Sequence, residues 1–226
     1  MLRILESKDA GRLLSRRAAR MSEAEKAVRP ILEDVRKKGD KALLGYARKF
    51  DKLTRKSVAV PEAELAAAES RLTSEFTHAV KESARNVREY AKLQLPQAKR
   101  TEPSPGLKLS QIVRPLDTVA AYIPAGRYPL PSTVIMTVVP AVVAGVARIM
   151  VCAPKAVDGI FGTAHMLGAT HVFEMGGAHA IAAFAYGTKT VPRADRIVGP
   201  GNIYVAAAKR LLAGEVGIGG HLPARQ

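Results

Sequence analysis

The spacing of apolar residues in the first third of the chain predicts helices. Between residues 22 and 39 the apolar positions recur at intervals of three and four, which places them on one helical face: Val28, Ile31, Leu32 and Val35. Ser22 has the side chain of a helix N-cap, and Glu25, three residues later, completes the signature of a capping box. Gly39 is expected to end this helix.

Three further helices are expected before residue 95. One runs from Asp40 to Phe50, and a short alanine-rich helix begins at Pro61. The third carries a second, mostly apolar stripe, composed of Phe76, Val80, Val87, Tyr90 and Leu93. The segment after it, PQAKRTEPSPGLKL, contains three prolines and a glycine, which interrupt regular structure. This segment is predicted to be a polar linker.

From Leu116 onward, short apolar runs alternate with longer helical segments. The runs TVAAYIP, ARIMVCAP, HVFEM and DRIV are predicted to be strands, and a turn and a helix follow each of them. Ser132 is expected to be the N-cap of the helix after the first strand. Strands that alternate with single helices form βαβ units. The predicted fold class is therefore α/β, with a parallel sheet and helices on both of its faces.

Composition and charge narrow the function classes. The longest nearly apolar run, residues 134–147, is too short to span a bilayer, and the amino terminus has no signal-peptide pattern, so we expect a cytoplasmic protein. The net charge is +15, but the basic residues are scattered beside acids along the predicted helices, and aromatic residues amount to only 5%. A surface for stacking bases needs aromatic residues among the basic ones. We therefore expect no specific nucleic-acid partner and no membrane partner.

The side chains that most often carry chemistry give little signal. Cys152 is the only cysteine and lies in an apolar run, so it is interpreted as a core residue rather than a nucleophile. The histidines are dispersed and are interpreted as surface or packing residues: His78, His165, His171, His179 and His221.

Glycines follow two of the predicted strands directly. Gly176 and Gly177 come after HVFEM, and Gly199 and Gly201 come after DRIV. In open α/β sheets ligands bind beyond the carboxyl ends of the strands, where glycines let a ligand approach the backbone and the next helix offers free N–H groups to an anion. Asn202 is a natural N-cap there. Neither loop matches the G-x-G-x-x-G or the P-loop pattern, so two interpretations stay open: a nucleotide or phosphate site, or glycines that serve only tight turns and packing.

Three long stretches carry a family resemblance. They are DVRKKGDKALLGYARKFD, YIPAGRYPLPSTVIMTVVPAVVAGVARIMVCAPK and GGAHAIAAFAYGTKTVPRADRIVGPGNIYVAAAKR. In this order and spacing they resemble histidinol dehydrogenase, from about residue 22 to Ile218. The resemblance implies a homodimeric, zinc-containing enzyme of histidine biosynthesis, which oxidises L-histidinol to L-histidine through the aldehyde with NAD as hydride acceptor.

The resemblance also implies a cofactor site. The tyrosine, glutamine and asparagine with which the family binds NAD fall on Tyr122, His179 and Asn202. His179 departs from the family pattern, because an imidazole offers one hydrogen bond per ring nitrogen and an amide offers a donor and an acceptor together. The family residues that ligate zinc and act as acid and base have no counterpart here, and His221 is no substitute for them. We therefore predict no catalytic and no metal-ligating residue in this chain.

The predicted organisation has three parts. Residues 1–121 form a mainly helical region that belongs to an incomplete second α/β domain, residues 122–218 form a Rossmann-like NAD-binding domain, and residues 219–226 are a tail unlike the family. The two apolar stripes of the first part are expected to lack a sheet to cover them and to stay exposed. Two alternatives to an inactive histidinol dehydrogenase fragment remain: a related NAD-dependent dehydrogenase of another polar alcohol, and a non-catalytic NAD-binding or assembly module.

Overall fold

The computed structural model describes residues 10–125, 128–155 and 157–219. Its first half is helical, as the apolar spacing predicts. The elements are α1 (Ala10–Lys38), α2 (Asp40–Tyr46), the π-helical turn η2 (Ala47–Asp51), α3 (Glu62–Ser70) and α4 (Ser74–Leu93). Gly39 ends α1 in a left-handed conformation, with φ of 53°. Ser22 is not an N-cap, because the alanine- and arginine-rich residues before it favour helix and α1 starts twelve residues earlier, at Ala10.

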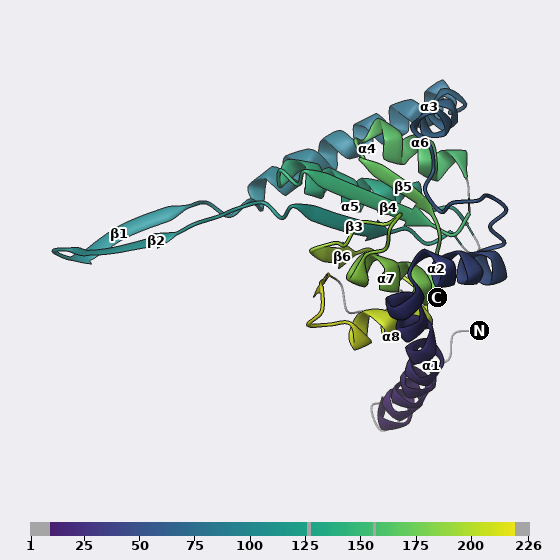
Figure 1. Ribbon diagram of the computed structural model, residues 1–226. Helices are drawn as coiled ribbons and strands as arrows, with labels where there is room; N and C mark the ends of the chain where they lie inside the picture. The colour runs from purple at the N-terminus through teal and green to yellow at the C-terminus, as the bar shows by residue number, and fades with distance from the viewer. Residues whose placement is uncertain (1–9, 126–127, 156, 220–226) are drawn as a thin grey trace.

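The segment after α4 is a hairpin rather than a linker. Strands β1 (Lys99–Ser104) and β2 (Leu107–Gln111) pair antiparallel, and the hairpin projects from the body of the molecule (Figure 1). Every residue of both strands is exposed. The register shifts between Thr101 and Ser104, so that Pro103 lies in an irregular part of the ladder, where a proline is tolerated. The prolines therefore misled the prediction, since they interrupt the ladder without preventing the pairing.

The second half builds one parallel sheet, as predicted. Its strands are β3 (Thr118–Tyr122), β4 (Arg148–Ala153), β5 (His171–Glu174), β6 (Arg196–Val198) and β7 (Gly217–Ile218). They lie in the order β5-β4-β3-β6-β7, and each neighbouring pair is parallel. The chain adds β4 and β5 on one side of β3 and then returns to place β6 on its other side. The strand order therefore reverses at the gap between β3 and β6.

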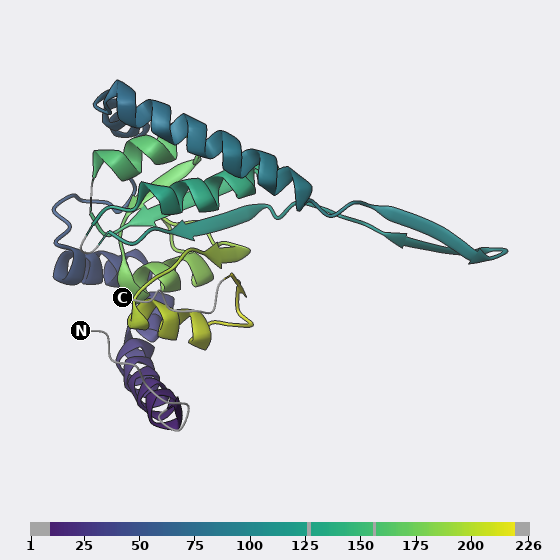
Figure 2. The ribbon, with the colours of Figure 1, turned by 180° about the vertical axis from the view of Figure 1, so that it is seen from behind.

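Helices cover both faces of this sheet. On one face lie α5 (Pro131–Val143) and α6 (Asp158–Met166), and on the other lie α7 (Gly177–Tyr186) and α8 (Ile203–Leu211). The N-terminal helices form outer layers, with α4 against α5, α3 against α6, and α1 against both α7 and α8 (Figures 1 and 2). Ser132 is not the N-cap of α5, because Pro131 already occupies the first helical position, which its fixed φ suits, and Leu130 precedes it.

The apolar stripes of the first part are covered rather than exposed. Val28, Leu32 and Val35 of α1 are buried in one core cluster with residues of α7 and α8, and Val80 of α4 is buried in the other cluster. Only the far end of the second stripe is exposed, at Tyr90 and Leu93. The expectation failed because it assumed that these helices need a second sheet. The division of the chain at residue 121 falls inside β3, and the assignment of the first part to an incomplete second domain stays a prediction.

An imidazolium clasp joins α3 to α6. The two ring nitrogens of His165 lie against the carboxylates of Glu69 and Glu62, the latter at 2.7 Å from Nε2. Both nitrogens can donate only when the ring is protonated. The hydrogen bond to Glu69, followed by that to Glu62, raises the pKa of His165 above its usual value, against the opposing effect of burial.

The clasp predicts a pH-dependent stability. A histidine whose pKa is raised on folding stabilises the fold below its unfolded pKa, and this contribution is lost as the pH rises through the folded-state pKa. We expect His165→Gln to lower the free energy of unfolding by about 1 kcal/mol in mildly acidic buffer and to have a smaller effect above that pKa. Urea titrations of both proteins across this range test the difference. An effect of His165→Gln that does not change with pH contradicts the charged clasp.

Candidate functional site

The carboxyl edge of the parallel sheet carries the candidate site. The turns after β3, β5 and β6 all leave the sheet at this edge, and the reversal of strand order lies between β3 and β6. In open α/β sheets the crevice at such a reversal is where ligands bind. The structure therefore brings Tyr122, His179 and Asn202 to one edge, on β3, on α7 after β5, and on the turn after β6 respectively.

The Gly-Pro-Gly-Asn turn after β6 lies directly on the backbone of β3. Gly199 has φ of 96°, and a Cβ atom at this position would lie 2.2 Å from the carbonyl oxygen of Tyr122. Gly201 is equally confined, since its Cβ would lie 2.3 Å from a methyl group of Val205. Only glycine allows both close approaches. The glycines are thus required by packing.

Asn202 is the N-cap of α8, as predicted. Its Oδ1 accepts hydrogen bonds from the backbone N–H groups of Tyr204 and Val205, at 3.0 and 3.1 Å. The residue as a whole is exposed. The side-chain amide nitrogen is therefore the part of Asn202 that remains to contact a ligand.

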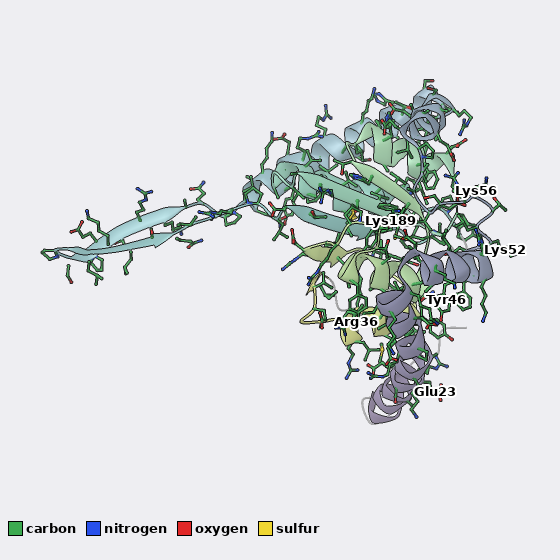
Figure 3. The ribbon with its side chains drawn as sticks, viewed as in Figure 1. Glu23, Arg36, Tyr46, Lys52, Lys56 and Lys189 are labelled. Carbon is green, nitrogen blue, oxygen red and sulfur yellow. The ribbon has the colours of Figure 1, made fainter. Side chains whose placement is uncertain are left out.

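Tyr122 and His179 are buried beneath this edge. The hydroxyl oxygen of Tyr122 accepts a hydrogen bond from Gly177 N–H at 3.3 Å, and burial raises the pKa of the phenol, which stays neutral. His179 is 1% exposed, and its ring centre lies 6.1 Å from that of Tyr46 (Figure 3) and 6.1 Å from that of Phe50, two rings that stack on each other. Both side chains therefore form the floor of the candidate site rather than its open surface.

Asp51, at the end of η2, organises the turn after β5. Its Oδ2 accepts a hydrogen bond from Gly176 N–H at 2.8 Å and lies 2.8 Å from His179 Nε2. No role was predicted for Asp51 from the sequence, although Asp51 is the last residue of the first of the three stretches that carry the family resemblance. No local pattern signals it, because its two partners lie 125 and 128 residues further along the chain.

Lys209 of α8 is the second polar residue that the sequence analysis missed. It is 4% exposed, and its Nζ donates a hydrogen bond to the carbonyl oxygen of Gly199 at 2.5 Å. Burial lowers the pKa of Lys209 to about 8. Cys152 of β4 is fully buried, and burial raises the pKa of its thiol. Both observations confirm that Cys152 is a core residue.

The residues that the structure describes provide hydrogen-bonding groups at this edge. Among them, no group of three histidine, cysteine, aspartate or glutamate side chains is placed to hold a metal ion. His221 lies outside the described residues. No helix in the described part of the chain is long and apolar enough to cross a membrane. The site consists of tight glycine turns, the exposed amide of Asn202, the buried ammonium group of Lys209, and the buried side chains of Tyr122, His179 and Asp51.

An apolar groove lies elsewhere on the surface, at the base of the hairpin. It has a volume of about 760 Å³ and is lined mainly by apolar residues between α4, α5 and β3, such as Leu95, Val113 and Met136. The groove contains none of the three candidate cofactor residues. This groove is the alternative place at which a ligand could bind.

Comparisons with known proteins agree on one family. The family profile described as Histidinol dehydrogenase matches residues 14–222. Curated proteins named histidinol dehydrogenase are similar to the chain: that of Methanothermobacter thermautotrophicus is 44% identical over 84% of this chain and 46% of the relative, and that of Methanosarcina barkeri is 45% identical over 88% and 47%. The crystal structure of histidinol dehydrogenase from Elizabethkingia anophelis superposes with a TM-score of 0.82 at 33% identity, over 88% of this chain and 47% of that one.

These matches establish the family, and they also show a difference in extent. The chain belongs to the histidinol dehydrogenase family. It spans about half the length of the curated relatives that it matches.

Proposed function

We propose that this member of the histidinol dehydrogenase family binds NAD at the carboxyl edge of its sheet, beside Tyr122, His179 and Asn202. The observation that carries the proposal is the Gly-Pro-Gly-Asn turn, which lies against β3 at the reversal of strand order and ends in the exposed Asn202. Of the three side chains, Asn202 is exposed and is proposed to contact the dinucleotide directly. Tyr122 and His179 support the turns from below, through Gly177 N–H and Asp51.

The residues at this edge fit a dinucleotide. The positive end of the α8 helix dipole lies at this edge and favours a negatively charged group there, and Asn202 caps the N–H groups of Tyr204 and Val205. NAD held at this edge would supply the hydride acceptor for the oxidation of an alcohol. The part of this chain is to hold and orient the cofactor.

We propose further that the reaction served is the family's oxidation of L-histidinol to L-histidine, by a cytoplasmic homodimer. The support is the family membership together with 44% and 45% identity to curated histidinol dehydrogenases. The family's zinc is a different matter, because the described residues contain no group fit to hold it. We derive no step through zinc from this chain.

Asn202→Asp separates ligand binding from helix capping. Aspartate caps a helix as well as asparagine does, so we expect the free energy of unfolding to change by less than about 0.5 kcal/mol. The added negative charge repels the phosphates of NAD, and the donor of the amide is lost, so we expect the dissociation constant for NAD to rise by roughly tenfold. Calorimetric titration of NAD into the wild type and the variant tests this, with urea unfolding as the control. Equal affinities for NAD would remove Asn202 from the site.

A further inference from the structure

A buried lysine lies directly beneath the turn to which we assign the cofactor. Lys209 is held ten residues after Gly199, on the second turn of α8, and its ammonium group donates a hydrogen bond to the Gly199 carbonyl. Gly199 is the residue that packs on the backbone of Tyr122. The lysine thus fixes the conformation of the turn at the point where the turn meets β3.

The ammonium group has no carboxylate partner among the residues that the structure describes. Its neighbour Arg210 does have one, since Arg210 Nε lies 3.2 Å from Glu25 of α1. Burial of an unpaired ammonium is costly, because the group loses its hydration and one carbonyl oxygen replaces only part of it. A methionine or leucine would fill the same volume without this cost. We therefore expect the positive charge of Lys209 to have a function that offsets this cost.

The groups around Lys209 leave its positive charge uncompensated. The titratable group that acts on Lys209 is the thiol of Cys152 on β4, which in turn acts on the phenol of Tyr122 on β3; burial raises the pKa of both the thiol and the phenol, so both are neutral. The carboxylate of Asp51 of η2, which also acts on the Cys152 thiol, accepts a hydrogen bond from Gly176 N–H and lies against His179. Glu25 of α1 is paired with Arg210. A buried ammonium group without an ion-pair partner among the described residues therefore lies under the site.

We propose that Lys209 is a positioning residue of the cofactor site, which holds the Gly-Pro-Gly-Asn turn through the Gly199 carbonyl and whose positive charge favours the binding of an anionic dinucleotide above it. The inference rests on the proposed binding of NAD at this turn. Lys209 does not contact the cofactor itself, since the backbone of the turn lies between them. Its charge acts across one peptide unit, in surroundings from which water is largely excluded, where electrostatic interactions are stronger than in water.

The charge makes the affinity for NAD depend on pH in a defined direction. Lysine is charged below its pKa of about 8 and neutral above it. An anion bound above the group stabilises the charged form, so by linkage NAD binds more tightly when Lys209 is charged and takes up protons when it binds near this pKa. We expect the dissociation constant of NAD to rise roughly fivefold between about pH 7 and about pH 9.

Four versions of the full chain test the proposal by calorimetric titration with NAD at these two pH values. The wild type is expected to lose affinity at the higher pH. Lys209→Met is expected to bind weakly at both values, and Lys209→Arg, which stays charged, is expected to show little pH dependence. Lys189→Met removes an exposed lysine (Figure 3) and is the matched control, expected to behave as the wild type does.

The outcomes separate this inference from the proposed function. In the wild type, titrations in two buffers of different ionisation enthalpy are expected to show proton uptake near pH 8, a result that requires no variant to fold. A wild type that binds NAD with the same affinity at both pH values, without proton uptake, overturns the role of the charge and leaves NAD binding intact. Absence of NAD binding at both pH values overturns the proposed function and this inference together.

Discussion

Replacing Gly199 with alanine is expected to destabilise the fold by about 3 to 5 kcal/mol, because two penalties coincide at this residue. The backbone has φ of 96°, a conformation that side chains with a Cβ atom rarely adopt. The new Cβ would also lie 2.2 Å from the carbonyl oxygen of Tyr122, so β3 or the turn after β6 must move. Both belong to the candidate site, so the variant is also expected to lose NAD binding. Urea unfolding followed by circular dichroism measures the stability.

Gly214→Ala is the matched control for this substitution. Gly214 has φ of 103°, but no atom lies within 4 Å of the position of its Cβ. This variant therefore carries the conformational penalty alone, which is about 1 kcal/mol. A loss of stability no larger for Gly199→Ala than for Gly214→Ala would show that the turn does not press on β3.

Leu32→Ala is the second substitution with a large expected effect. Leu32 is 4% exposed and belongs to the core cluster that α1 shares with α7 and α8. Removing a buried leucine side chain leaves a cavity, and we expect a loss of about 2 to 4 kcal/mol in the free energy of unfolding. The transition is expected to remain single, since α1 and the sheet share one core. Urea titration followed by both circular dichroism and Tyr fluorescence measures the loss and the coincidence of the transitions.

Leu93→Ala provides the control with the same chemical change. Leu93 is 82% exposed at the end of α4, so the expected change is below about 0.5 kcal/mol. Equal effects of the two substitutions, or an early separate transition in Leu32→Ala, would indicate that α1 is not part of the core that supports the sheet.

Local patterns predicted most elements of the fold. Strands β3 to β6 and the helices between them follow from the alternation of short apolar runs with glycine-punctuated helices, and the end of α1 follows from Gly39. The β1–β2 hairpin was missed because Pro103 and Gly106 signal both a loop and an interrupted ladder. The burial of Val28 and Val80 was missed for another reason. An apolar stripe shows that a helix is covered, but it does not show by which surface.

The candidate site divides in the same way. Asn202 and the glycines around it were found because capping and tight turns are properties of consecutive residues. Asp51 is joined to the turn after β5 only by the folded chain, from 125 residues away. Lys209 lies in an ordinary helical sequence, where a lysine is normally exposed, and only the packing of α8 buries it. The positions of both therefore had to come from the structure.

The most direct test of the account is to map where NAD binds, by following the amide resonances of the ¹⁵N-labelled full chain during a titration. We predict that the shifted resonances gather at the carboxyl edge of the sheet, at Ile123, Gly176, Gly199 and Asn202 and their neighbours, with little change at the hairpin. Shifts confined to the apolar groove at the base of the hairpin, or no shift at NAD concentrations well above those in the cell, would contradict the assignment of a dinucleotide site to this edge.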